Sequence, residues 1–326
     1  MVIIYFAFFL LFLLGFLALG LDMAKLMATR TQLQNAADAA ALAGASAIDL
    51  ETGAIDPDTA IVRAQETAAL NKAYRDGAEP VTLLVQDIEF PTPLQVKVTV
   101  RRSPATGGSM VTHLAQVIGI KNLEISAQAT AEADTTAQVC DGLVPMAPVE
   151  PPNSGWFDPD CSQTYDLKVG SGQGEQGNYE LLDYPPCNEG PCAGLNGGAA
   201  IRCIAEHGYG CCLDESQEFT LTEPGNKVGP FRQGMQARFD ADTDQRQGIC
   251  YIEYAGNGNR VVRLPVIESF DVNGKKYVRI VRFSAFFIKY RPAGNATLQG
   301  QFVFDVAPGN QPGGGKGTIF TLRLVH

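Results

Sequence analysis

The chain opens with an uncharged apolar stretch, Met1 to Leu21, that is hydrophobic on every side. As a helix it would span roughly 30 Å, about the hydrocarbon thickness of a bilayer. The hydrophobic pattern continues without a helix breaker, which predicts a single helix over about 1–48. The basic segment and the small-residue cleavage site of a secretory signal peptide are missing from it. This pattern is typical of a transmembrane helix or of a helix in the core of a filament.

From Asp22 onward the same predicted helix becomes amphipathic and rich in small residues. Small side chains let helices approach closely, which favours packing against other helices. The alternative is a stalk whose alanines serve helix propensity alone. The positions that recur at spacings of three and four residues are Leu33, Ala36, Ala37, Ala40, Ala41, Gly44 and Ala47.

The next segment is predicted to form a small α+β subdomain that docks against this helix. A second helix is expected over 57–75, with Asp56 or Asp58 as its N-cap and Gly77 beyond its end. Alternating apolar and polar positions predict strands, and one short apolar run predicts a helix. These elements are strands over 81–90, 94–102 and 123–133, and a short helix over 110–118.

The C-terminal segment is predicted to be β-rich after an initial loop region, because Pro, Gly, Asn and Cys dominate residues 140–200. Helical turns are expected at 196–207 and 228–239, and strands near 249–254, 260–268, 277–290, 298–306 and 317–325. The predicted fold class is therefore α+β, with three parts. They are a long N-terminal helix (1–50), a small α+β subdomain (51–139) and a disulfide-rich, mainly antiparallel β domain (140–326).

All eight cysteines lie in this last part. An even number behind an apolar segment indicates disulfides formed in an oxidising compartment. Cys187 and Cys192 could close a small loop, whereas the neighbours Cys211 and Cys212 are expected to bond to different partners, since a bond between them would be strained. The predicted disulfide cysteines are Cys140, Cys161, Cys187, Cys192, Cys203, Cys211, Cys212 and Cys250.

The net charge of the chain is −10. This acidic balance argues against a nucleic-acid partner, because phosphate binding needs a basic face. It is compatible with a soluble, self-repelling outer surface.

Asp240, Asp242 and Asp244 form the one notable carboxylate cluster. Oxygen ligands at every second position are how a calcium loop begins, so these residues are a weak calcium candidate. Gln245 and Tyr251 replace the glycine and the glutamate that such a loop uses at its sixth and twelfth positions, which favours an ordinary solvated turn.

Other candidate chemistry is weak. Cys203 and His207 have a spacing that could contribute to a zinc site, but disulfides are the better interpretation. No Ser-His-Asp or Cys-His arrangement can be assembled from the sequence, so an enzyme is not expected. No cofactor other than the calcium candidate is predicted.

Asp22 follows the apolar stretch directly. A carboxylate at the end of such a helix is costly to bury and needs a partner or water. Lys25, one turn later, and Arg30 are candidate partners within the chain. In a membrane these three residues would sit at the interface. In a filament Asp22 could instead pair with a neighbouring subunit, for example with the amino terminus at Met1.

The N-terminal part resembles the TadE/TadG-like family of tight-adherence (Flp) pilus proteins. The matching features are the apolar run, then Asp22, Arg30 and LQNAADAAALAGA at 33–45. Four later strings look like the C-terminal half of TadG-related proteins. These are GNYELLDY (177–184), EPGNKVGPFRQGMQARFD (223–240), RLPVIESF (263–270) and VRFSAFFIKY (281–290).

The resemblance implies a pilin-like helix in a protein of pilus assembly or of the pilus itself. Two family features are not carried over. Type IV pilins have Glu at position five of the mature chain, where this sequence has Tyr5. Many TadG proteins carry a von Willebrand-type domain with a DxSxS metal motif, which this sequence lacks, so its adhesive function is not implied.

Three functional hypotheses follow. The first is a structural subunit of an extracellular Tad or type IV pilus-like filament, which is inserted in the inner membrane before assembly and polymerises with its own copies through the N-terminal helix. The second is a membrane-anchored TadG-like assembly factor or minor pilin that contacts other pilus assembly proteins without forming a homopolymer. The third is an extracellular binding or adhesive module in which the β-rich region 140–326 holds a ligand, which the sequence does not name.

Overall fold

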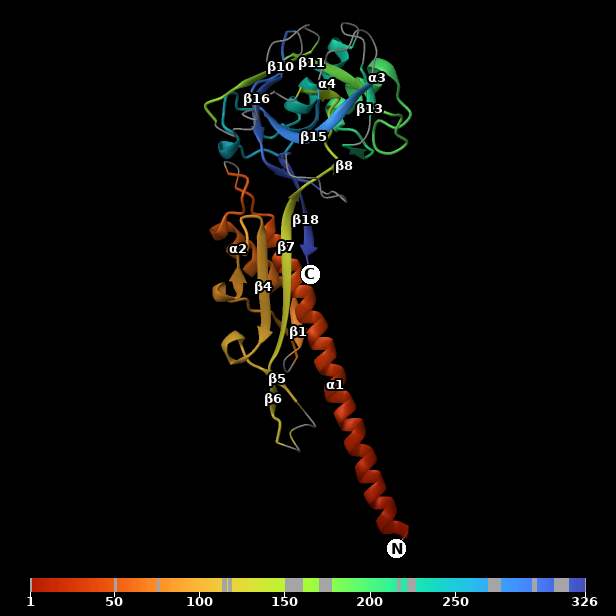
Figure 1. The fold of residues 1–326 in the computed structure, drawn as a ribbon, viewed down its shortest axis with the longest axis vertical. Coiled ribbons are helices and arrows are strands. Elements are labelled where there is room, and N and C mark those ends of the chain that lie inside the picture. Colours follow the sequence, from red (N-terminus) through yellow and green to blue (C-terminus); the bar gives the residue numbers. More distant parts are fainter. Residues whose placement is uncertain are drawn as a thin grey trace. The chain divides into compact units, whose positions relative to one another are not determined.

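A computed structural model describes residues 2–49, 52–74, 77–112, 116, 119–149, 161–169, 178–215, 218–221, 227–268, 277–294, 298–307 and 317–325. The chain divides into two compact units (Figure 1). Unit 1 comprises 1–47, 54–133 and 322–326, and unit 2 comprises 48–53 and 134–321. The predicted helix and the predicted α+β subdomain thus share one unit. The larger segment of unit 2 starts at Asp134, whereas the sequence predicts a boundary at residue 140.

Unit 1 is built on the long helix α1 (Val2–Ala45), which runs without interruption as predicted. The second half of α1 packs on helix α2 (Pro57–Leu70) and on strand β4 (Gln95–Arg102), as Figure 1 shows. A Cβ atom at Gly44 would lie 3.1 Å from the side chain of Val96, so the small residue permits this close approach. The fully buried residues of the α1 face are Leu33, Ala36, Ala37, Ala40, Ala41 and Ala45.

Strand β4 organises the sheet of unit 1. It pairs antiparallel with β3 (Ile88–Glu89) and, over its whole length, with β7 (Ile125–Thr135). Every second side chain of β7 is buried, as the alternating pattern predicted. Short pairs complete the unit: β1 (Lys72–Tyr74) with β2 (Ala78–Pro80), and β5 (Met110–Val111) with β6 (Asn122–Leu123).

Three predicted elements of unit 1 differ in the structure. Helix α2 begins at the predicted N-cap, where Asp56 accepts a hydrogen bond from the backbone N–H of Thr59, but it ends at Leu70 rather than at residue 75. The buried Arg102 guanidinium donates to the carbonyl oxygens of Ala73, Glu79 and Pro80, which stabilises the β1–β2 pair where helix was expected. Only 88–89 of the predicted strand 81–90 is strand, and the predicted helix over 110–118 begins as β5.

Unit 2 is organised by a seven-stranded sheet in the order β10-β16-β15-β13-β11-β9, with β14 also paired to β15. Apart from the parallel β10–β11 pair, the neighbours in this sheet are antiparallel. Its strands are β9 (Met146–Ala147), β10 (Tyr165–Val169), β11 (Asn178–Asp183), β13 (Glu218–Leu221), β14 (Val261–Ile267), β15 (Tyr277–Ile288) and β16 (Leu298–Val303).

Strand β15 separates two hydrophobic clusters. Phe283, Ala285 and Phe287 face one cluster, and Phe286 and Ile288 face the other. Helices α3 (Gly197–His207) and α4 (Val228–Asp240), which agree with the predicted helical turns, pack on each other and contribute apolar side chains to the second cluster. Burial on both faces explains why the second half of β15, from Phe283 to Ile288, is hydrophobic at every position except Ser284.

Two predictions for unit 2 need correction. The segment predicted as a strand near 249–254 contains the 3₁₀ turn η4 (Tyr251–Glu253), because Glu253 accepts a hydrogen bond from the backbone N–H of Cys250 and closes the turn. The region predicted as loop, 140–200, contributes three strands to the sheet. The remaining strands are β8 (Gln138–Val139), β12 (Leu213–Asp214), β17 (Asp305–Val306) and β18 (Ile319–Val325).

The packing of α3 on α4 depends on Gly234. A Cβ atom there would lie 2.2 Å from the carbonyl oxygen of Arg202 and 2.7 Å from the Cβ of Ala205. We expect Gly234→Ala to lower the free energy of unfolding by about 1–3 kcal/mol, because overpacking forces the helices apart. Gly229→Ala on the same helix is the control, since its Cβ would meet nothing within 4 Å. Urea unfolding followed by circular dichroism measures both, and equal losses would contradict this explanation.

Candidate functional site

The first half of α1 presents large apolar side chains to solvent. Phe9 and Phe16 are each 65% exposed, although a soluble domain normally buries phenylalanine. In Figure 1 this half of the helix extends beyond the strands of unit 1. We call these side chains the apolar surface of α1; they are Ile4, Tyr5, Phe6, Phe9, Leu10, Leu13, Phe16 and Leu21.

The predicted assembly residues differ in their surroundings. Tyr5 and Arg30 are exposed, whereas the Asp22 side chain is only 6% exposed. The Lys25 ammonium lies 5.4 Å from the centre of the Tyr74 ring, a cation–π distance, so this lysine is engaged by unit 1. Met1 lies outside the described residues.

The small-residue face of α1 is separate from its apolar surface. Ala60, Ala64 and Ala68 of α2 are fully buried, like the alanines of α1 that share the core of unit 1. This face therefore serves packing within the unit. The sequence favours packing of these small residues against other helices, and the helix that they meet is α2 of the same unit.

The sequence also predicts that the N-terminal segment spans a membrane. Among the residues that the structure describes, no helix meets the length and apolarity that a membrane crossing requires.

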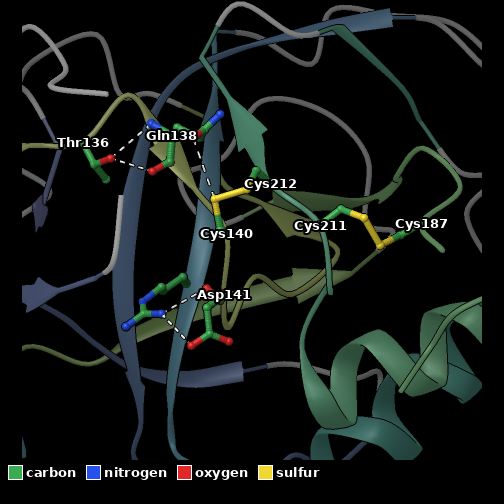
Figure 2. Close-up of a disulfide and its surroundings, with 8 residues drawn as sticks. Thr136, Gln138, Cys140, Asp141, Cys187, Cys211 and Cys212 are labelled. Carbon is green, nitrogen blue, oxygen red and sulfur yellow. Dashed lines mark hydrogen bonds and ion pairs between the residues drawn. A yellow bond between two sulfur atoms is a disulfide. The ribbon is translucent and has the colours of Figure 1, made fainter. Parts of the chain in front are cut away.

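Four disulfides join all eight cysteines within unit 2: Cys140–Cys212, Cys161–Cys250, Cys187–Cys211 and Cys192–Cys203. Figure 2 shows the two neighbouring cysteines, Cys211 and Cys212, bonded in different directions, as predicted. The suggested bond between Cys187 and Cys192 was wrong, because Cys192 pairs with Cys203 on α3. Cys203 is consequently not available as a zinc ligand beside His207.

The acidic cluster is held by the protein's own groups. Asp240 forms a two-pronged ion pair with Arg291, with both N···O distances 2.6 Å. Asp244 accepts two hydrogen bonds from the Arg246 guanidinium, at 2.9 and 2.7 Å, and others from the backbone N–H groups of Arg246 and Ala255. Within the described ranges, no group of three or more His, Cys, Asp or Glu side chains is arranged to hold a metal ion.

Asp242 connects this cluster to a buried arginine. Its carboxylate accepts hydrogen bonds from the Tyr254 hydroxyl and from the backbone N–H groups of Asp244 and Arg260. The Arg260 side chain is fully buried and lies over the ring of Phe287 at 4.6 Å. It donates to the carbonyl oxygens of Asp244, Arg246, Ile288 and Lys289, so the acidic turn has a structural role.

This turn predicts a dependence of stability on pH. Hydrogen bonds from Arg246 and from the Ala255 backbone lower the pKa of Asp244, and the Arg291 hydrogen bond lowers the pKa of Asp240. Both carboxylates therefore stabilise the fold above about pH 4, and this contribution is lost as the pH falls through the folded-state pKa values. We expect Asp244→Asn to lower the melting temperature at neutral pH and to flatten its decrease below about pH 4. Asp183→Asn, on an exposed residue outside the turn, is the control, and parallel profiles for both variants would refute the assignment.

The apolar surface of α1 lies in a segment that matches a known protein family. Residues 2–47, which contain the whole of α1, match the family described as putative Flp pilus-assembly TadE/G-like. This chain carries a TadE/G-like N-terminal segment. The resemblance predicted for this part of the sequence is confirmed, and the similarity predicted for the later strings stays a prediction. No curated protein and no solved structure matches the chain.

The match relates residues 2–47 to proteins described as putative Flp pilus-assembly proteins. Together with the four disulfides of unit 2, it indicates a protein of the cell envelope or the exterior. The sequence was sufficient to find the apolar surface of α1, because its residues form one continuous stretch without charges. It did not find the cavity beside α3 and α4 described below, whose lining residues come from distant parts of unit 2.

Proposed function

We propose that this protein is a structural subunit of an extracellular Tad or type IV pilus-like filament, and that its copies polymerise through the N-terminal helix. The observation that carries the proposal is the apolar surface of α1, whose large side chains are exposed in the isolated chain. Burying such a surface is favourable by about 25 cal/mol per Å² of apolar area, so copies of the helix gain free energy when they pack together.

The geometry of this contact favours a fibre. In the proposed filament each α1 packs between the α1 helices of neighbouring copies, so one face meets a different face of the next copy. A contact of this kind that does not close into a ring extends into a helical filament. The acidic surface of the chain would face water around such a core and limit unspecific association.

The buried carboxylate of Asp22 lies where the apolar surface ends. In the proposed filament it, Lys25 and Arg30 mark the boundary between the apolar core and the folded part of unit 1. Before assembly, the uncharged stretch up to Leu21 would be held in the inner membrane, where other pilus assembly proteins deliver it to the growing fibre. A role in cell adhesion would belong to the completed filament.

The alternative is a membrane-anchored assembly factor or minor pilin that does not homopolymerise. The family that residues 2–47 match is described as one of pilus assembly, which favours this alternative. Electron microscopy of sheared surface material, with mass spectrometry of the same fraction, separates the two functions. Abundant filaments composed of this chain support the subunit. Retention of the chain in the inner-membrane fraction, with filaments made of another protein, overturns that role in favour of the alternative.

A further inference from the structure

Unit 2 contains a polar cavity of about 430 Å³, within the range of small-molecule sites in proteins. Six parts of unit 2 line it: the segment after β8, the C-terminal end of α3, the C-terminal end of α4, the turn η4 with the loop that follows it, the start of β14, and β17. The residues that matter for the argument are Asp141, Glu206, Arg238, Tyr251, Asn259 and Arg263.

Arg238 is the central group of this cavity. The residue is buried, with only 7% of its surface exposed. The Nε–H donates to the carbonyl oxygens of Ala205 and Glu206, at 2.9 and 3.1 Å, at the last turn of α3. The two Nη groups make no hydrogen bond to any described residue and are not enclosed by the protein, so they border the cavity. Burial lowers the pKa of Arg238 to about 10, so it stays charged at neutral pH.

The other arginine of the cavity is already engaged. Arg263 is paired with Asp305, with N···O distances of 2.9 Å, and more loosely with Asp141 at 3.4 Å. Figure 2 shows Asp141 directly after Cys140 of the Cys140–Cys212 disulfide, which anchors this wall. The four Nη–H donors of Arg238 are thus available to a ligand.

The polar groups of the cavity are mixed in kind. The Tyr251 hydroxyl and the Asn259 side-chain oxygen, like the Arg238 donors, have no hydrogen-bond partner among the described residues. With two arginines against the carboxylates of Asp141, Glu206 and Asp305, the lining carries a formal charge of −1. An anionic ligand would be repelled by the carboxylates, and a cationic ligand by the buried Arg238. A neutral ligand that both donates and accepts hydrogen bonds fits this lining.

We propose that the cavity binds a neutral saccharide. Hydroxyl oxygens of the sugar accept hydrogen bonds from Arg238, and sugar O–H groups donate to Asn259 and to the acidic side chains. The inference rests on unit 2 alone and holds whether or not the chain polymerises, so its failure would leave the proposed function intact.

The test is titration calorimetry of the purified full-length protein with methyl glycosides of glucose, galactose and mannose. The protein is kept in a zwitterionic detergent, because a sugar-headed detergent would compete for the cavity. Methyl glucuronide is the matched acid probe. We expect saturable binding of at least one neutral glycoside, and weaker binding of the glucuronide.

Variants assign any binding to the cavity. Arg238→Lys keeps the charge but removes the planar donor pair, and should weaken binding at least about tenfold. Arg232→Lys, on the same helix but outside the cavity, should not change it. Asn259→Ala, on the loop before β14, serves if Arg238→Lys does not fold, and it should also weaken binding. No saturable binding of any neutral glycoside, binding of the glucuronide only, or binding that both cavity variants leave unchanged would each overturn the proposal.

Discussion

Cells that express Phe9→Asp are expected to lose surface filaments built of this chain. Phe9 belongs to the apolar surface of α1 and is 65% exposed in the isolated chain. In the proposed filament the carboxylate would be buried among apolar helices. The cost is about 3 kcal/mol for an aspartate at the centre of an apolar helix environment, which corresponds to roughly a 100-fold loss of assembled material. Quantitative immunoblotting of sheared filaments, normalised to total protein, measures the loss.

Thr31→Asp is the matched control for this variant. It places the same charge at an exposed position of the same helix, beyond the apolar surface. Filament yield should stay near that of the unmodified chain, and circular dichroism should show unit 2 folded in both variants. Wild-type filament levels with Phe9→Asp would contradict polymerisation through this helix.

Removal of the Cys140–Cys212 disulfide is expected to cause a large loss of stability in unit 2. The two cysteines are 72 residues apart, and the nested Cys187–Cys211 bond shortens the loop that they close. The chain-entropy relation then gives a loss of about 4 kcal/mol in the free energy of unfolding when both cysteines are replaced by serine. Denaturant unfolding under non-reducing conditions measures this loss.

The Cys192→Ser/Cys203→Ser variant is the natural comparison, because this pair closes a separation of only 11 residues. The same relation gives about 3 kcal/mol for this loop. A larger loss here than for Cys140 and Cys212 would mean that packing around α3, rather than the entropy of the unfolded chain, governs disulfide stabilisation in unit 2. Replacing both cysteines of a pair avoids a free thiol that could exchange with the remaining bonds.

The local patterns of the sequence determined the elements of this protein well where one periodicity dominates. The uninterrupted hydrophobic run predicted α1, and the strict alternation at 123–133 predicted β7. Apolar and polar positions along a single helix or strand report directly on which face is buried. The same reasoning found the apolar surface of α1, since it consists of neighbouring residues in one helix.

Other elements depended on contacts between distant residues. The predicted second helix ends early because the Arg102 side chain, some 30 positions away, binds the carbonyl oxygens of β1 and β2. The burial of the small residues of α1 against α2 and β4, rather than against another copy, likewise follows from tertiary packing. A local pattern does not predict the contact made by the small residues, because the same residues would suit packing within the chain or against another copy.

The sequence by itself determined that a charge-free helix leads the chain and that its cysteines form disulfides, because hydrophobicity and cysteine number are properties of composition and order. Only the tertiary structure decided which cysteines pair, and why the aspartates of 240–244 engage arginines. It alone brought Arg238, Asn259 and Asp141 to one cavity. Pairing and cavity formation depend on which backbone segments come together, and that is set by packing of the whole unit.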